Sequence, residues 1–202
     1  RVREALTQVL DFAWINQNLF FGLYKRSDSF FAASELSAHD RPASARERAL
    51  LAPFPGAVTP DVMEGRWSPP QSDGSGSDRR NARLAIDLMA QAGYQLAASR
   101  MVAKTDGGTV GQDFDFEIMV VSRDQEKLAL NYASSLRRIG VTASVRLVDE
   151  AQYWKRLRSF DFDMILNIWN VVASPGSEQM NRWSVAAADR EGTLNYAGVR
   201  EP

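Results

Sequence analysis

The chain has 202 residues, 45% of them hydrophobic and 24% charged, with a formal net charge of −1 and no cysteine. This is an ordinary globular composition, and so small a charge gives no electrostatic reason to expect a nucleic-acid partner or an anionic membrane surface. The absence of cysteine excludes disulfides and thiolate metal sites, and no apolar run reaches the roughly 18 residues needed to cross a bilayer.

The first twenty residues have the apolar spacing of two helices. Residues 1–10 place their apolar side chains on one helical face, and Asp11 can end this helix or cap a second one over 12–20. Residues 24–76 are expected to form a long irregular excursion, although 44–51 suits a short helix. Four prolines prevent long elements in that excursion, namely Pro42, Pro53, Pro55 and Pro60.

A helix and a hairpin are predicted next. Ser77 or Asp78 can cap a helix that ends at Gly93. The glycine-rich stretch 73–76 precedes this helix, and phosphate groups can bind at the N-terminus of a helix. This stretch lacks the lysine of a phosphate-binding loop and does not follow a strand, so a plain turn is the favoured interpretation. The segment 100–104, a turn over 105–108 and the run from Phe114 together predict a hairpin.

The most strongly patterned part of the chain predicts an α/β core within residues 77–170. A strand over 114–121 is followed by a helix that Asp124 can cap and Gly140 can end, and then by a second strand over 141–148. A strand, a helix and a strand of these lengths form a parallel βαβ unit. Asp149 then caps a short helix, and 160–169 returns as a third strand.

Catalytic chemistry has few candidate residues in this sequence. One strand carries alternating acidic residues, Asp113, Asp115 and Glu117, which could place carboxylates on one face for acid–base catalysis. The favoured interpretation is that they are charges on the solvated face of a hairpin. A hydrolase using these residues stays open as an alternative, as does a structural interaction domain. His39 is the only histidine, so neither a histidine-based triad nor a histidine-rich metal site is expected.

A binding site is expected where the chain leaves the third strand. Ligands of α/β sheets bind beyond the carboxyl ends of the strands, and aromatic side chains offer a large apolar surface for stacking. The irregular segment that follows the third strand would line this site. The predicted ligand-binding residues are Trp169, Asn170, Ser174, Arg182 and Trp183.

Several stretches in the same order resemble one family. They are RVREALTQVLDFAWI at the start, RLAIDLMAQAGY in the predicted capped helix, and FEIMVVSRDQEKLALNYASSLRRIGVTASVRLVDEAQYWKRLRSFDFDMIL in the core. The whole chain is similar to extracellular solute-binding proteins of the peptide and nickel class, family 5, which are receptors of ABC importers. SFFAASEL, LLAPF and PPQSDGSGSDRRNARLA resemble the oligopeptide and microcin C type.

The resemblance implies a fold and a function. The fold would be α/β, with residues 1–202 forming one lobe of a two-lobe periplasmic binding protein (type II-like) built on a mixed sheet flanked by helices. The chain would be a fragment of a longer receptor whose other lobe completes the cleft. A monomer would capture oligopeptides or peptide-like compounds in the periplasm and dock on an ABC permease of the inner membrane, without catalysis, cofactor, metal or nucleic acid.

One position departs from the family pattern. Many peptide receptors of this family follow the corresponding tryptophan with an acidic residue that holds the ammonium group of a peptide. Here Trp169 is followed by Asn170, Val171, Val172, Ala173 and Ser174. The departure predicts that the cargo is held differently or has a blocked amine.

Overall fold

The computed structural model describes residues 1–32, 34–105, 110–171 and 174–200. The described chain divides into two compact units. Unit 1 comprises Arg1–Leu23, Gln71–Ile168 and Ser177–Pro202, and unit 2 comprises Tyr24–Pro70 and Trp169–Gly176. The expectation of a single lobe over 1–202 stays a prediction, and each unit is described here by itself.

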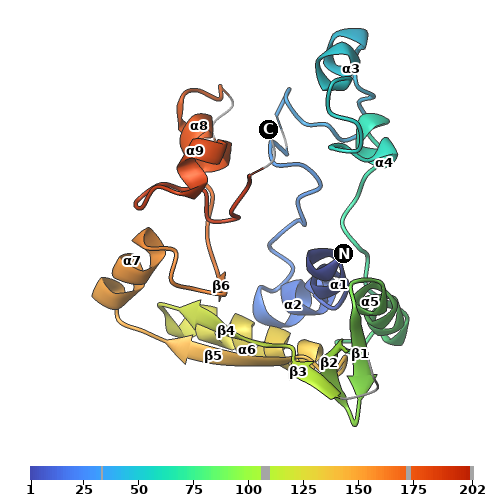
Figure 1. The fold of residues 1–202 in the computed structure, drawn as a ribbon, viewed down its shortest axis with the longest axis vertical. Helices are drawn as coiled ribbons and strands as arrows, with labels where there is room; N and C mark the ends of the chain where they lie inside the picture. Colours follow the sequence, from blue (N-terminus) through green and yellow to red (C-terminus); the bar gives the residue numbers. More distant parts are fainter. Residues whose placement is uncertain (33, 106–109, 172–173, 201–202) are drawn as a thin grey trace. The chain divides into compact units, whose positions relative to one another are not determined.

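Unit 1 contains a parallel three-stranded sheet with the order β5-β4-β6 (Figure 1). Its central strand is β4 (Asp115–Val120), which pairs in parallel with β5 (Thr142–Leu147) and with β6 (Met164–Ile165). Helix α6 (Arg123–Arg137) connects β4 to β5. This arrangement confirms the βαβ unit predicted from the sequence.

The two faces of this sheet are covered by different helices because side chains alternate along a strand. Ile118 packs on Ala129 of α6, whereas the neighbouring Met119 packs on Tyr153 of α7 (Glu150–Arg158). The predicted cap of α7 is also confirmed, since the Asp149 side chain accepts a hydrogen bond from a backbone N–H of the first turn. The sheet is therefore sandwiched between one helix on each face.

A second sheet in unit 1 is antiparallel and has the order β1-β2-β3. It consists of β1 (Tyr94–Ala97), β2 (Arg100–Lys104) and β3 (Val110–Asp113). The predicted hairpin partner of β2 is wrong, because β2 pairs with β3 while the run from Phe114 enters the parallel sheet. The predicted turn residues 106–108 lie outside the described residues. Parallel and antiparallel pairings thus occupy separate sheets within the described chain.

Three helices predicted before the sheets are confirmed. They are α1 (Val2–Gln8), α2 (Phe12–Leu19) and α5 (Arg79–Gln91). Asp11 caps α2, and Asp78 caps α5 by accepting hydrogen bonds from two backbone N–H groups. An aspartate at the N-cap satisfies amides that have no partner within the helix, which explains why both helices start where they do.

Two predicted boundaries are wrong. Helix α6 is capped by Ser122 and not by Asp124, since the Ser122 side chain accepts from the Gln125 backbone N–H at 3.2 Å. The third strand does not extend over 160–169, because regular pairing covers only β6 and Phe160 has a φ of 56°. A left-handed backbone conformation cannot continue a strand.

The main core of unit 1 lies where α1 and α5 meet the end of α6 and the strand β2. The side chains of this cluster are buried and apolar: Ala5, Leu6, Val9, Ala85, Met89, Met101, Leu136, Ile139 and Val141. Further along the chain, unit 1 also contains the short helices α8 (Glu178–Trp183) and α9 (Val185–Ala188).

Unit 2 contains two short helices, α3 (Ala45–Leu51) and α4 (Pro60–Met63). The predicted helix over 44–51 is confirmed as α3, which begins with a reciprocal capping box between Ser44 and Glu47. Backbone hydrogen bonds tie the two ends of this region together, from Ala43 N to the Met63 carbonyl at 2.8 Å and from Asp40 N to the Gly65 carbonyl at 2.9 Å.

Candidate functional site

Three of the predicted ligand-binding residues belong to unit 2. Trp169 is half-buried, and Asn170 and Ser174 are exposed. Residues 172 and 173, which lie between them, are outside the described residues. Trp169 does not end the third strand, because β6 already ends at Ile165.

The other two predicted residues, Arg182 and Trp183, belong to unit 1 and lie in α8 rather than on an irregular segment. The Trp183 indole N–H donates to the Gln179 side-chain oxygen at 2.9 Å, which is one turn earlier in the helix. Only 9% of Arg182 is exposed, so this residue is buried within unit 1. Since the five residues are divided between two units, the predicted site stays a prediction.

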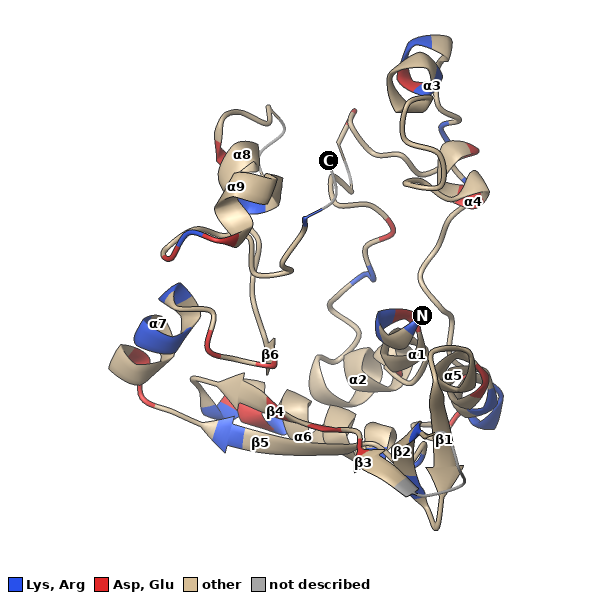
Figure 2. Cartoon of the chain, in the orientation of Figure 1, with Lys and Arg blue, Asp and Glu red and all other residues tan. Residues whose placement is uncertain are grey.

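The three acidic residues considered for catalysis have different surroundings. Asp113 is exposed and forms an ion pair with Arg100 at 2.8 Å, and Asp115 is exposed at the start of β4. Figure 2 shows acidic residues on β4 and basic residues on β5 and α7. Glu117 is one of the acidic residues on β4, and it forms ion pairs with basic residues of β5 and α7.

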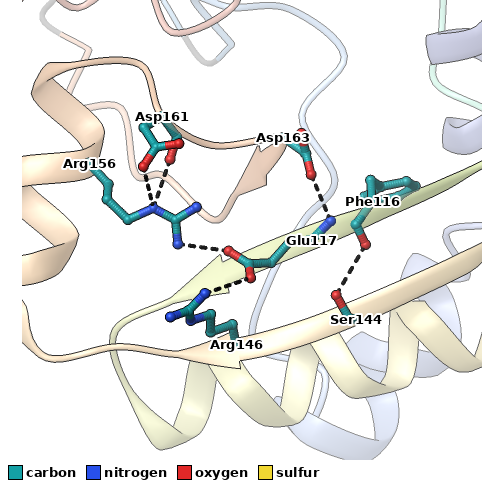
Figure 3. A network of polar contacts seen from close by, with 7 residues as sticks. All are labelled: Phe116, Glu117, Ser144, Arg146, Arg156, Asp161 and Asp163. Atoms are coloured by element: carbon teal, nitrogen blue, oxygen red, sulfur yellow. Dashed lines mark hydrogen bonds and ion pairs between the residues drawn. The ribbon is translucent and has the colours of Figure 1, made fainter.

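Glu117 is the centre of a polar network on the α7 face of the parallel sheet (Figure 3). Its carboxylate accepts from Arg156 of α7 at 2.8 Å and from Arg146 of β5 at 3.4 Å. Arg156 also donates to the Asp161 carboxylate at 3.1 Å. The hydrogen bond to Glu117 is the main cause of the raised pKa of Arg156.

This network positions the chain that leads into β6. The Asp163 carboxylate accepts from the backbone N–H of Glu117 at 2.9 Å, and Asp161 is held by Arg156. Residues 161–163 are thereby fixed beside β4 immediately before Met164 enters the sheet. Because two arginines share the Glu117 carboxylate, this group stabilises the local structure and is not placed to act as a general base.

A second polar cluster, the Asp11 clamp, joins the capped start of α2 to the glycine-rich turn. The buried Asp11 carboxylate accepts from Ser72 Oγ at 2.6 Å, from Gly76 N at 2.7 Å and from Trp14 N at 3.0 Å. A cavity of ≈ 20 Å³ beside it has room for about one water molecule. The stretch 73–76 is therefore a turn fastened by Asp11.

We expect Asp11→Ala to lower the free energy of unfolding by about 1.5–3 kcal/mol, because it leaves buried donors without their charged acceptor. Chemical denaturation monitored by circular dichroism measures this change. The matched control is Asp87→Ala on the exposed face of α5, which should stay within about 0.5 kcal/mol of the wild type. Equal stabilities for the two variants would contradict a role for the clamp.

Unit 2 contains an aromatic pocket with a volume of ≈ 450 Å³, which falls in the range of about 300–1,000 Å³ found for ligand pockets. Sequence reasoning missed this pocket because its residues come from a stretch without helical or strand periodicity. Its main side chains are Asp28, Phe30, Phe31, Leu36, His39 and Trp67.

Within the described ranges, no three His, Asp or Glu residues come together in a way that could hold a metal ion. Over the same part of the chain, none of the helices combines the length and apolar character of a membrane span.

Comparison with protein families gives one match over residues 1–190, to "Bacterial extracellular solute-binding proteins, family 5 Middle". The chain belongs to this family of solute-binding proteins. The match confirms the resemblance inferred from the sequence, and it confirms the assignment to binding proteins rather than enzymes.

Three curated relatives are similar over the entire chain. They are BMEII0691 of Brucella melitensis at 50% identity, "Peptidoglycan-binding protein YepA" of Agrobacterium fabrum at 40%, and "Probable peptide-binding protein YejA" of the same organism at 38%. Each alignment includes 100% of this chain but only 32% of the relative. It therefore corresponds to about a third of these proteins.

Solved structures confirm the fold class. One of them is NikZ from Campylobacter jejuni, solved in complex with Ni(L-His). The superposition covers 98% of this chain and 32% of the NikZ chain, with a TM-score of 0.67 and 17% sequence identity. At this identity the likeness concerns the fold alone. The α/β chain thus has the fold of a part of a solute-binding protein.

Proposed function

We propose that this chain is part of the solute-binding component of an ABC importer that captures oligopeptides or peptide-like compounds in the periplasm. The receptor would act as a monomer and deliver its cargo to a permease in the inner membrane. The observation that carries the proposal is the family match over residues 1–190.

The names of two relatives support a peptide-like cargo. One relative is named for peptide binding and another for peptidoglycan binding, and both align with the entire chain. Peptidoglycan contains short peptides, so the two names share peptide chemistry. Free oligopeptides and peptide-bearing fragments are therefore the first compounds to test.

The contacts of Glu117 weigh against the hydrolase alternative. Two arginines share its carboxylate, while Asp113 is paired with Arg100. A general base needs a carboxylate within reach of the proton that it removes, and these partners compete for it. A binding role for the protein requires no such free carboxylate.

Ligand analysis of the full-length protein tests the proposal. We expect mass spectrometry of the natively purified protein to detect peptides or peptide-bearing fragments, because closed binding proteins retain their cargo. The same protein, stripped by unfolding and refolded, serves as the control and should regain saturable peptide binding in calorimetry. Absence of peptides from the native sample, together with no binding of tripeptide pools to the stripped protein, would overturn the proposal.

A further inference from the structure

We infer that the aromatic pocket of unit 2 binds a cationic group of the cargo, an ammonium or guanidinium, between the Asp28 carboxylate and aromatic rings. The inference rests on the proposed function and specifies where such a group would bind. All residues that line the pocket lie between Asp28 and Trp67, so the pocket belongs to unit 2 alone.

The walls of the pocket are fixed by backbone contacts. Ser29 Oγ accepts from the N–H groups of Phe31 at 3.3 Å and Ala38 at 3.4 Å, which joins two parts of the wall. Gly65 has a φ of +66°, and a Cβ there would lie 2.5 Å from Arg41 N. Only glycine permits this close approach of two backbone segments, so the pocket exists before a ligand arrives.

The apolar side chains of the pocket are mostly aromatic. The Phe30 and Phe31 rings meet edge to face with their centroids 5.0 Å apart. Trp67 lies in the same lining and is 41% exposed. Aromatic faces carry partial negative charge and attract cations, with tryptophan the most effective.

The charged and polar side chains of the pocket are the Asp28 carboxylate and the His39 imidazole, which lie next to each other. Asp28 Oδ2 lies 3.7 Å from His39 Nδ1, which is too long for a hydrogen bond. On the other side of the ring, His39 Nε2 lies 3.5 Å from an Asp40 carboxylate oxygen. The buried Nδ1 atom has no hydrogen-bond partner within the described chain.

A positively charged N–H donor satisfies both features of the pocket. It can donate to the Asp28 carboxylate while its carbon chain contacts the aromatic rings. A sugar suits the pocket less well because its many hydroxyl groups need many partners, and Ser29 Oγ is already engaged with two backbone amides. A purely apolar group would cover the partly buried Asp28 carboxylate without giving it a donor, which costs free energy.

Three pools of tripeptides test the inference with the full-length protein. The first has free amino termini and no basic side chain, the second is N-acetylated with lysine at the centre, and the third is N-acetylated with norleucine there. We expect calorimetry to show that at least one cationic pool binds more than about tenfold more tightly than the uncharged third pool. The first two pools distinguish a terminal ammonium from a side-chain ammonium.

Variants of Asp28 identify the group responsible. Asp28→Asn should reduce the preference for the cationic pool to less than about twofold, while Asp28→Glu should retain most of it. The matched control is Asp40→Asn, since Asp40 flanks the other side of His39 but is outside the pocket lining, and this variant should keep the wild-type preference. Melting temperatures close to that of the wild type would show that each variant is folded.

The outcomes separate this inference from the proposed function. Equal binding of all three pools by the wild type, or an unchanged preference in folded Asp28→Asn, would overturn the cation pocket while leaving peptide binding intact. Failure of every pool to bind the wild-type protein would overturn peptide binding and the pocket's role with it.

Discussion

We expect Leu136→Ala to lower the free energy of unfolding by about 2–5 kcal/mol, because it removes buried apolar surface and leaves a cavity. Leu136 is 0% exposed and lies near the end of α6. It packs in the main core of unit 1, where α1, α5 and β2 also contribute side chains. Urea denaturation monitored by circular dichroism gives the change directly.

The same helix supplies a control for this prediction. Leu130 lies on the outer face of α6 and is 55% exposed, so Leu130→Ala deletes the same atoms where little surface was buried. We expect it to change stability by less than about 0.5 kcal/mol. A Leu136→Ala protein as stable as the Leu130→Ala protein would place the core of unit 1 elsewhere.

We expect Gly140→Ala to destabilise the protein by about 2–5 kcal/mol through two effects that add. Gly140 has a φ of +79°, a conformation that costs a residue with a Cβ about 1–2 kcal/mol. An added Cβ would also lie 2.8 Å from Met101 N, whose position is fixed by a 2.7 Å hydrogen bond to the Gly140 carbonyl. Crowding of a packed site costs a further 1–3 kcal/mol, roughly.

Gly93→Ala separates these two effects. Gly93 also follows a helix with a positive φ of +90°, but a Cβ there would meet nothing within 4 Å. We expect this change to cost only the conformational part, about 1–2 kcal/mol. Differential scanning calorimetry of both variants compares them, and equal losses would show that the backbone of Met101 moves to accommodate the added methyl group.

Local signals predicted five helices of unit 1, α1, α2, α5, α6 and α7, but not the short helices α8 and α9. Asp11, Asp78 and Asp149 each cap the helix that the sequence assigned to them, and Gly140 adopts the left-handed conformation expected at a helix end. Each of these signals involves residues that are close together in the sequence, so both partners of the interaction can be recognised from the sequence alone. Pairing of β4 with β5 followed from the length of the connection between them.

Features that depend on alternative partners could not be predicted in the same way. Ser122 and Asp124 are both good N-cap residues, and the choice depends on where β4 ends. The residues after Phe160 have the apolar composition of a strand. Only the two residues of β6 pair with β4, and other apolar residues of this stretch are held by packing in the core. Propensity alone does not reveal which backbone groups find a neighbour.

The candidate binding residues show the same limit. The sequence analysis predicts an irregular segment after Trp169 that includes Arg182, whereas the structure buries Arg182 in the six-residue helix α8. The aromatic pocket had no local signature, because Asp28 and Trp67 are far apart in the sequence and share a lining through long-range contacts such as the hydrogen bond from Asp40 N to the Gly65 carbonyl.

The Asp11 clamp also has a consequence for how this protein can diversify. Its hydrogen bonds to Ser72 and Gly76 join positions 61 and 65 residues apart, and the segment between them includes Tyr24–Pro70 of unit 2. The free energy of closing a flexible loop grows only with the logarithm of its length, so doubling the segment adds about 0.6 kcal/mol. Insertions and deletions within this segment therefore cost the α/β scaffold little free energy as long as the Asp11 clamp is kept.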